Sequence, residues 1–162
     1  MRRIPRHLAR APIWLYRAGL GGLLGRRMVM LDHRGRRSGQ VRHVVLETVA
    51  ERGDGVVVVS GYGWDSQWLR NVQADPRVRL WRGWQRPRPA TAHILDPAQT
   101  VDVLEDYRRR HPAAACLLVA TLGLPALADD APVPPDVADS LPAVLVRARR
   151  LQGSSPKSHQ CP

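Results

Sequence analysis

The sequence predicts one α+β domain in which about six mainly antiparallel strands form a small barrel or a strongly curved sheet, with helices packed outside. The length of 162 residues and the 44% hydrophobic content are those of a single globular domain. Six short apolar segments have the character of strands, and helical segments precede, interrupt and follow them. Strands and helices do not alternate regularly, which argues against a parallel, doubly wound sheet.

The first predicted element is a helical region over residues 5–25, where leucines are interspersed with arginines. Its apolar and basic character, with Trp14 and Tyr16 at the boundary, suits either an anionic membrane surface or the open face of the barrel. Strands are expected over residues 28–31 and 41–49, separated by a loop over residues 33–40.

Turn residues delimit the central elements. Residues 52–55 read Arg-Gly-Asp-Gly, a hairpin-type turn with glycines where a positive φ is required. Residues 56–60 form the β-branched run expected of a buried strand. Asp65 is expected to cap a helix over residues 66–74, which stops before Asp75-Pro76.

The second half of the chain predicts two strands, two helices and a last strand. These segments are strands 78–81 and 88–95, a helix from Asp96-Pro97 to His111-Pro112, a helix over 113–122 and a strand over 142–146. The expected organisation is an N-terminal helical segment at residues 1–26, a barrel domain at residues 27–150 and a disordered tail at residues 151–162.

Basic residues are concentrated in the first third of the chain. The formal net charge is +11, and residues 1–45 contain eleven arginines against one acidic residue, Asp32. Such a surface indicates either plain solvation or an anionic partner: nucleic acid, an acidic membrane, or a small ligand with phosphate or carboxylate groups. No helix-turn-helix, zinc-finger or aromatic RNA-binding pattern is present, so no nucleic-acid partner is expected.

The loop Gly35-Arg36-Arg37-Ser38-Gly39, followed by Arg42, has the composition of an anion site. Glycines let backbone N–H groups approach an anion, and guanidinium and hydroxyl groups add charge-assisted hydrogen bonds. The alternative is an ordinary solvated loop. The sequence is not a Walker loop, because its GK[ST] ending is missing.

A second candidate region joins the strand ending at Ser60 and the loop Gly61-Tyr62-Gly63 to a helix that carries Trp68 and Asn71. Those two side chains are three positions apart and therefore share a helix face. They either form an aromatic wall and an amide donor for a flat heterocycle, or Trp68 anchors the helix while Asn71 faces water.

Other classes of site are not supported. The histidines have no carboxylate or cysteine at ligand spacing, so no metal site is expected. The elbow motif of serine hydrolases is missing. Two cysteines, Cys116 and Cys161, make no disulfide framework, which favours a reduced, cytoplasmic setting. Glu47, the one acid in a valine-rich strand, is either outward-facing or part of a pocket.

Taken together, these segments resemble the deazaflavin-dependent nitroreductase family within the flavin-binding split β-barrel superfamily. The matching segments are residues 31–39, 57–63, 68–71 and 75–78, in the same order and spacing. The resemblance implies an FMN-binding-type split barrel that holds coenzyme F420, a deazaflavin with a phosphodiester and an oligoglutamate tail. It also implies hydride transfer from the reduced coenzyme to a small electron-poor acceptor, a quinone or a nitro compound.

The resemblance assigns residues to the cofactor and to catalysis. The cofactor residues would be Arg36, Arg37, Ser38, Gly39, Arg42, Val58, Val59, Ser60, Gly61, Trp68 and Asn71. Ser60 would polarise the acceptor or fix the ring, and Glu47 or His111 would donate a proton. Glu47 and residues 111–114 stand where nitro-reducing members carry tyrosines, which makes efficient nitroreduction doubtful.

Two alternatives stay open. One is a protein of the same fold that binds FMN, or that binds F420 without useful catalysis. The other is a basic nucleic-acid or membrane-surface protein, with residues 5–25 as the membrane contact. Split barrels often dimerise, so a homodimer is also an open expectation.

Overall fold

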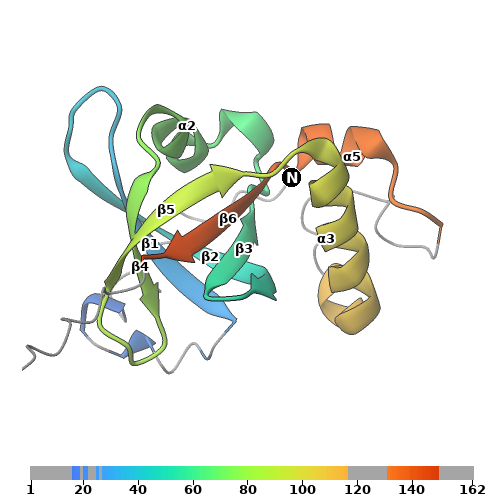
Figure 1. Cartoon of the computed structure of the whole chain (residues 1–162), viewed down its shortest axis with the longest axis horizontal. Coiled ribbons are helices and arrows are strands. Elements are labelled where there is room, and N and C mark those ends of the chain that lie inside the picture. The colour runs from blue at the N-terminus through green and yellow to red at the C-terminus, as the bar shows by residue number, and fades with distance from the viewer. Residues whose placement is uncertain (1–15, 19, 22–24, 26, 117–130, 150–162) are drawn as a thin grey trace, which may run out of the picture.

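Six antiparallel strands form a closed barrel in the computed structural model, which describes residues 16–18, 20, 21, 25, 27–116 and 131–149 (Figure 1). The strands are β1 (Met28–Arg34), β2 (Val41–Arg52), β3 (Gly55–Val59), β4 (Arg77–Arg82), β5 (Arg88–Ile94) and β6 (Ala143–Ala148). Their order around the barrel is β1-β2-β3-β6-β5-β4, and pairing of β4 with β1 closes it. Closure leaves no edge strand open for pairing. The predicted six-stranded barrel is confirmed.

Helices cover one end and one side of this barrel. Helix α2 (Gln67–Ala74) follows the short 3₁₀ turn η3 (Gly63–Asp65), and Figure 1 shows it lying across one end of the strands. Helix α3 (Pro97–Arg110) lies beside the barrel, next to the short helix α5 (Pro135–Ser140). None of the helices that the structure describes is long and apolar enough to span a membrane.

The interior of the barrel is filled by alternate residues of the strands, because successive side chains of a strand point to opposite faces. Leu31, Val58 and Val144 are fully buried there. Helix α2 closes this core at one end with Trp68, Leu69 and Val72.

A second cluster lies between the barrel and α3, on the outer face of β2, β3 and β6. It joins Val57 and Leu145 of the sheet to Val103 and Tyr107 of α3. The start of α3 follows the sequence expectation: Pro97 is its first residue, and Asp96 Oδ1 accepts a hydrogen bond from Gln99 N at 2.8 Å in a capping box.

The structure corrects the expected cap of α2 and the expected ends of strands β1, β2 and β6, and some predicted elements lie outside the described residues. The prediction that Asp65 caps α2 is wrong, because Ser66 precedes the first helical residue and Asp65 belongs to η3, where it pairs with Arg70. Strand β1 continues to Arg34, three residues beyond the predicted end, because each residue to that point pairs with β2. Most of the predicted helical region 5–25, residues 117–122 and the tail 151–162 lie outside the described residues.

Leu69→Ala is expected to lower the free energy of unfolding by about 2–5 kcal/mol, because it leaves a cavity where α2 closes the barrel and Leu69 is fully buried. Urea denaturation at pH 7 measures this loss. Gln73→Ala, on the exposed face of the same helix, is the control and should change stability by less than about 0.5 kcal/mol. A loss below about 1 kcal/mol for Leu69→Ala would show that α2 does not close the core.

Candidate functional site

The arginine loop is the hairpin connection between β1 and β2. The Gly35 N–H donates to the carbonyl of Gln40 at 2.9 Å, and the Gly39 N–H donates to the carbonyl of Gly35 at 2.7 Å. Gly39 has a φ of +65°, and a Cβ on Gly35 would lie 2.8 Å from Ser38 Oγ. The positive φ of Gly39 therefore favours glycine, whereas a Cβ on Gly35 would displace the Ser38 hydroxyl.

The side-chain amide of Asn71 ties this loop to α2 and to β1. Its Oδ1 accepts hydrogen bonds from the backbone N–H of Arg36 at 3.1 Å and from Arg36 Nη1 at 3.0 Å. Its Nδ2 donates to His33 Nδ1 at 3.2 Å. Asn71 is only 6% exposed, so the alternative in which it faces water is wrong. Its position makes it a structural support of the loop.

A cavity of about 560 Å³ lies between this loop, the start of β2 and α2. Six of the predicted cofactor residues line it: Arg36, Arg37, Ser38, Arg42, Trp68 and Asn71. Trp68 also belongs to the barrel core, so it is both an anchor and a wall of the cavity. The structure thus brings together residues that are up to 35 positions apart in the sequence.

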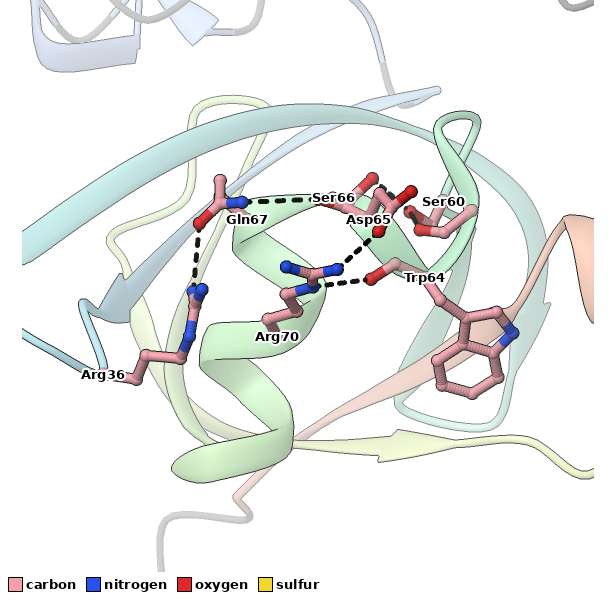
Figure 2. Close-up of polar contacts among 8 residues, drawn as sticks. Arg36, Ser60, Trp64, Asp65, Ser66, Gln67 and Arg70 are labelled. Atoms are coloured by element: carbon pink, nitrogen blue, oxygen red, sulfur yellow. Dashed lines mark hydrogen bonds and ion pairs between the residues drawn. The ribbon is translucent and has the colours of Figure 1, made fainter.

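The arginines of the cavity differ in what they bind. Arg36 Nη1 also donates to Gln67 Oε1 at 3.1 Å, so its guanidinium is held against α2, as Figure 2 shows. Arg37 and Arg42 make no side-chain hydrogen bond or ion pair with any described residue. These two guanidinium groups are therefore free to bind an anion at the cavity.

His33 helps to hold Asn71 in place, and it does so as a neutral imidazole. His33 is 5% exposed at the end of β1, and burial lowers its pKa to about 4. The imidazole is therefore neutral at pH 7, and its Nδ1 can accept the hydrogen bond from Asn71. The sequence pattern alone did not indicate this role of His33.

Ser60 lies behind the cavity and does not line it. It is fully buried; its Oγ donates to the carbonyl of Gly63 at 2.8 Å and lies 2.6 Å from Ser66 Oγ in a hydroxyl–hydroxyl hydrogen bond. Figure 2 shows these serines beside Arg70, whose guanidinium binds Asp65 and the carbonyl of Trp64. This network shapes the turn between β3 and α2, which is a positioning role.

The other predicted residues near Ser60 also lie away from the cavity lining. Val58 points into the barrel core, and Val59 packs toward α3 and α5. Gly61 and Gly39 are near the cavity in sequence but are not among the residues that line it. Tyr62 and Gln67 also line the cavity, although neither was among the predicted cofactor residues. Tyr62 is 78% exposed, and its position in a glycine-flanked loop was the available signal.

Glu47 and His111 lie in a second cluster, farther along β2 and against the end of α3. Tyr107 donates its phenolic hydrogen to Glu47 Oε1 at 3.0 Å, and Arg27 Nη2 pairs with the same carboxylate oxygen. Burial and the bond to Glu47 raise the pKa of Tyr107 to about 12. The His111 ring lies 5.4 Å from the Tyr107 ring and borders a cavity of about 280 Å³ with Arg27.

Tyr107 was not predicted as a site residue, although its place four residues before His111 on a helix puts both on one face. Glu47 is half-buried and paired, so neither simple expectation, outward or in a pocket, describes it fully. Val44 lines the first cavity and Glu47 is three residues farther, about 10 Å along the strand. Because they are an odd number of positions apart, Val44 and Glu47 project from opposite faces of β2: Val44 packs against the barrel core, and Glu47 meets Tyr107 on the outer face.

The family model for F420H(2)-dependent quinone reductase matches residues 8–115. No curated protein matches the sequence.

Three solved structures share the fold at low identity. The structure of an F420-H2 dependent reductase (FDR-A) is 23% identical, covering 75% of this chain and 95% of that one, with a TM-score of 0.50. A domain-swapped dimer is 21% identical over 85% and 100% of the two chains, with a TM-score of 0.51. A pyridoxamine 5'-phosphate oxidase-related, FMN binding protein from Nostoc punctiforme PCC 73102 is 11% identical over 91% and 82%, with a TM-score of 0.51.

Because His33 is buried in its neutral form, we expect the protein to lose stability in acid. Its pKa in the folded chain, about 4, is below the 6.5 of an unfolded histidine, so the unfolded state binds the proton more tightly. The stabilising contribution is complete above about pH 6.5 and is lost as the pH falls toward 4, by about 2–3 kcal/mol.

His33→Gln offers Asn71 an acceptor that does not titrate. Between pH 7 and pH 4 the wild type should therefore lose about 2–3 kcal/mol more unfolding free energy than this variant does. Urea denaturation at a series of pH values measures it. A difference that stays constant with pH would contradict the neutral, buried imidazole.

Proposed function

Because the chain belongs to the F420H(2)-dependent quinone reductase family, we propose that it transfers a hydride from reduced coenzyme F420 to a small electron-poor acceptor, a quinone in preference to a nitro compound. Because members of this family depend on reduced F420, F420 is the cofactor and the chain is an F420-dependent reductase. The observation that carries the proposal is the cavity of about 560 Å³ with the unpartnered guanidinium groups of Arg37 and Arg42 at its wall.

The residues of this cavity fit an anionic, ring-containing cofactor. Its volume lies in the usual range of small-molecule sites. Arg37, Arg42 and Ser38 offer charge-assisted and neutral hydrogen bonds that would hold a phosphodiester and carboxylates. Trp68 and Tyr62 offer flat apolar surfaces beside them. The position of Arg36 is set by Asn71 and Gln67, so it would keep the loop in place while its neighbours bind.

The reduced coenzyme supplies the hydride, and the protein must supply binding, orientation and a proton. The Glu47–Tyr107 pair holds a proton between two oxygens 3.0 Å apart. Since the pKa of Tyr107 is about 12, its phenol stays protonated at neutral pH. We infer that this pair, with His111 beside it, protonates the oxygen of the acceptor. Residues 112–114 carry no aromatic side chain to enclose a nitro-heterocycle, which supports a quinone.

We also propose a cytoplasmic location and a homodimer. Cys116 is a free, exposed thiol, which suits a reducing compartment. One structural neighbour is a domain-swapped dimer, which supports the proposed homodimer, and size-exclusion chromatography tests the assembly.

The first prediction concerns the anion-binding arginines. Arg37→Gln and Arg42→Gln should each weaken F420 binding by about 1.5–3 kcal/mol, because each removes a charge-assisted hydrogen bond. The loss should grow at low ionic strength, where exposed charges are least screened. Fluorescence titration with purified F420 measures the affinity. Arg110→Gln, on α3 and paired with Asp106, is the matched control. Equal affinity for F420 in the wild type and in all three variants would exclude this cavity as the cofactor site.

A second prediction concerns proton transfer. Tyr107→Phe keeps the ring packed in its cluster but removes the hydroxyl from Glu47, so kcat with a quinone should fall at least tenfold while the Kd for F420 stays unchanged. Glu47→Gln should give a similar loss, and the double variant should be little slower than either single variant if the two groups act as a unit. Steady-state oxidation of reduced F420 measures these rates. Wild-type turnover in both single variants would remove the pair from the reaction.

A further inference from the structure

A second basic cavity lies at the other end of the barrel from the arginine loop. Its volume is about 680 Å³, and it borders the β2–β3 turn and the outer face of β5 and β6. It shares no lining residue with the cavity at the loop. Arg42 of the first cavity and Arg52 of the second are ten residues apart on β2, which is about 30 Å along the strand.

The barrel register places the basic side chains of this cavity in one row. Arg52 of β2 lies opposite Gly55 of β3, Gly55 lies opposite Arg147 of β6, and Arg147 lies opposite Thr91 of β5. Residues directly opposite one another project from the same face of a sheet. Val146 points into the barrel core, so Arg147 and the rest of the row project outward.

This geometry sets the spacing of the charges. Neighbouring strands are about 4.8 Å apart, so the Cα atoms of Arg52 and Arg147 are separated by about 10 Å. Gly55 adds no side chain between them. Arg149 follows Arg147 by two residues, and its N–H donates to the carbonyl of Pro89 at 2.9 Å, which fixes the backbone there. Three guanidinium groups thus border one cavity.

Among the described residues, basic side chains outnumber acidic ones around this cavity. The side chains of Arg52, Arg147 and Arg149 make no hydrogen bond or ion pair with the residues that the structure describes, whereas Arg77 and Arg82 on the neighbouring strand β4 pair with Asp75 and Glu51. Asp54 is the one acidic residue in the lining, and His93 adds a further donor. Like charges on one face of a sheet repel each other. An anion bound between the guanidinium groups would offset this repulsion.

We propose that this cavity is a second anion-binding site that takes a phosphate group, either of a soluble phosphorylated molecule or of a lipid headgroup. Guanidinium forks from two strands match the several oxygens of a phosphate better than a single carboxylate. The site is independent of the cofactor cavity, because the two cavities share no lining residue and Arg52 lies at the other end of β2 from Arg42.

Pyrophosphate is the probe for the soluble source, and vesicles of phosphatidylglycerol in phosphatidylcholine are the probe for the lipid source. Both are applied to full-length Arg37→Gln/Arg42→Gln protein, which lacks the two unpartnered guanidinium groups of the first cavity. Adding Arg52→Gln/Arg147→Gln should weaken binding at least tenfold, by calorimetry for pyrophosphate or by co-sedimentation for vesicles. Adding Arg109→Gln, an exposed arginine of α3, should leave it unchanged.

Saturable binding of pyrophosphate alone would support the proposal and assign a soluble ligand. Binding of anionic vesicles that pyrophosphate displaces would support it and assign a lipid headgroup. Binding of neither probe, or equal binding with and without Arg52 and Arg147, would overturn it. Circular dichroism of each variant confirms folding, and Arg147→Lys, which keeps the charge but loses the fork, should lose part of the affinity.

Discussion

The buried amide of Asn71 is the interaction on which the site depends. Helix α2 must bury Trp68, Leu69 and Val72 to close the barrel, and this packing carries Asn71 inward with them. A buried amide must have its hydrogen bonds satisfied. Asn71 satisfies them with Arg36 and with the neutral ring of His33, so the packing of the core decides where the loop lies.

The large positive charge of the chain is divided by the fold into groups with different roles. Some arginines are held by acids or amides, as Arg70 is by Asp65 and Arg36 is by Asn71. Others border cavities without a partner among the described residues, at opposite ends of the strands. Paired arginines on an exposed surface contribute little to stability. Arginines that border a cavity without a partner can instead form charge-assisted hydrogen bonds with a bound anion.

Strand β2 contributes residues both to the cavity beside the arginine loop and to the Glu47–Tyr107 cluster. Arg42 and Val44 near its start border the cavity beside the arginine loop, and Glu47 farther along it meets Tyr107 of α3. The barrel is shared with FMN-binding proteins at very low identity, so the fold does not by itself determine the activity. In the function proposed above, activity depends on the side chains at the ends and outer face of the barrel: the arginines of the loop and the Glu47–Tyr107 pair.

Local sequence determined the elements: β-branched runs predicted the strands, turn glycines their connections, and Asp96-Pro97 the start of α3. Together with the family resemblance it also predicted Arg37, Arg42 and Trp68 as site residues, because these lie in short motifs. Only the tertiary structure decided that Ser60 is buried behind the cavity and that Glu47 meets Tyr107, sixty positions away. The physical reason is that such contacts depend on barrel register and helix packing, which bring distant residues together and which no local pattern encodes.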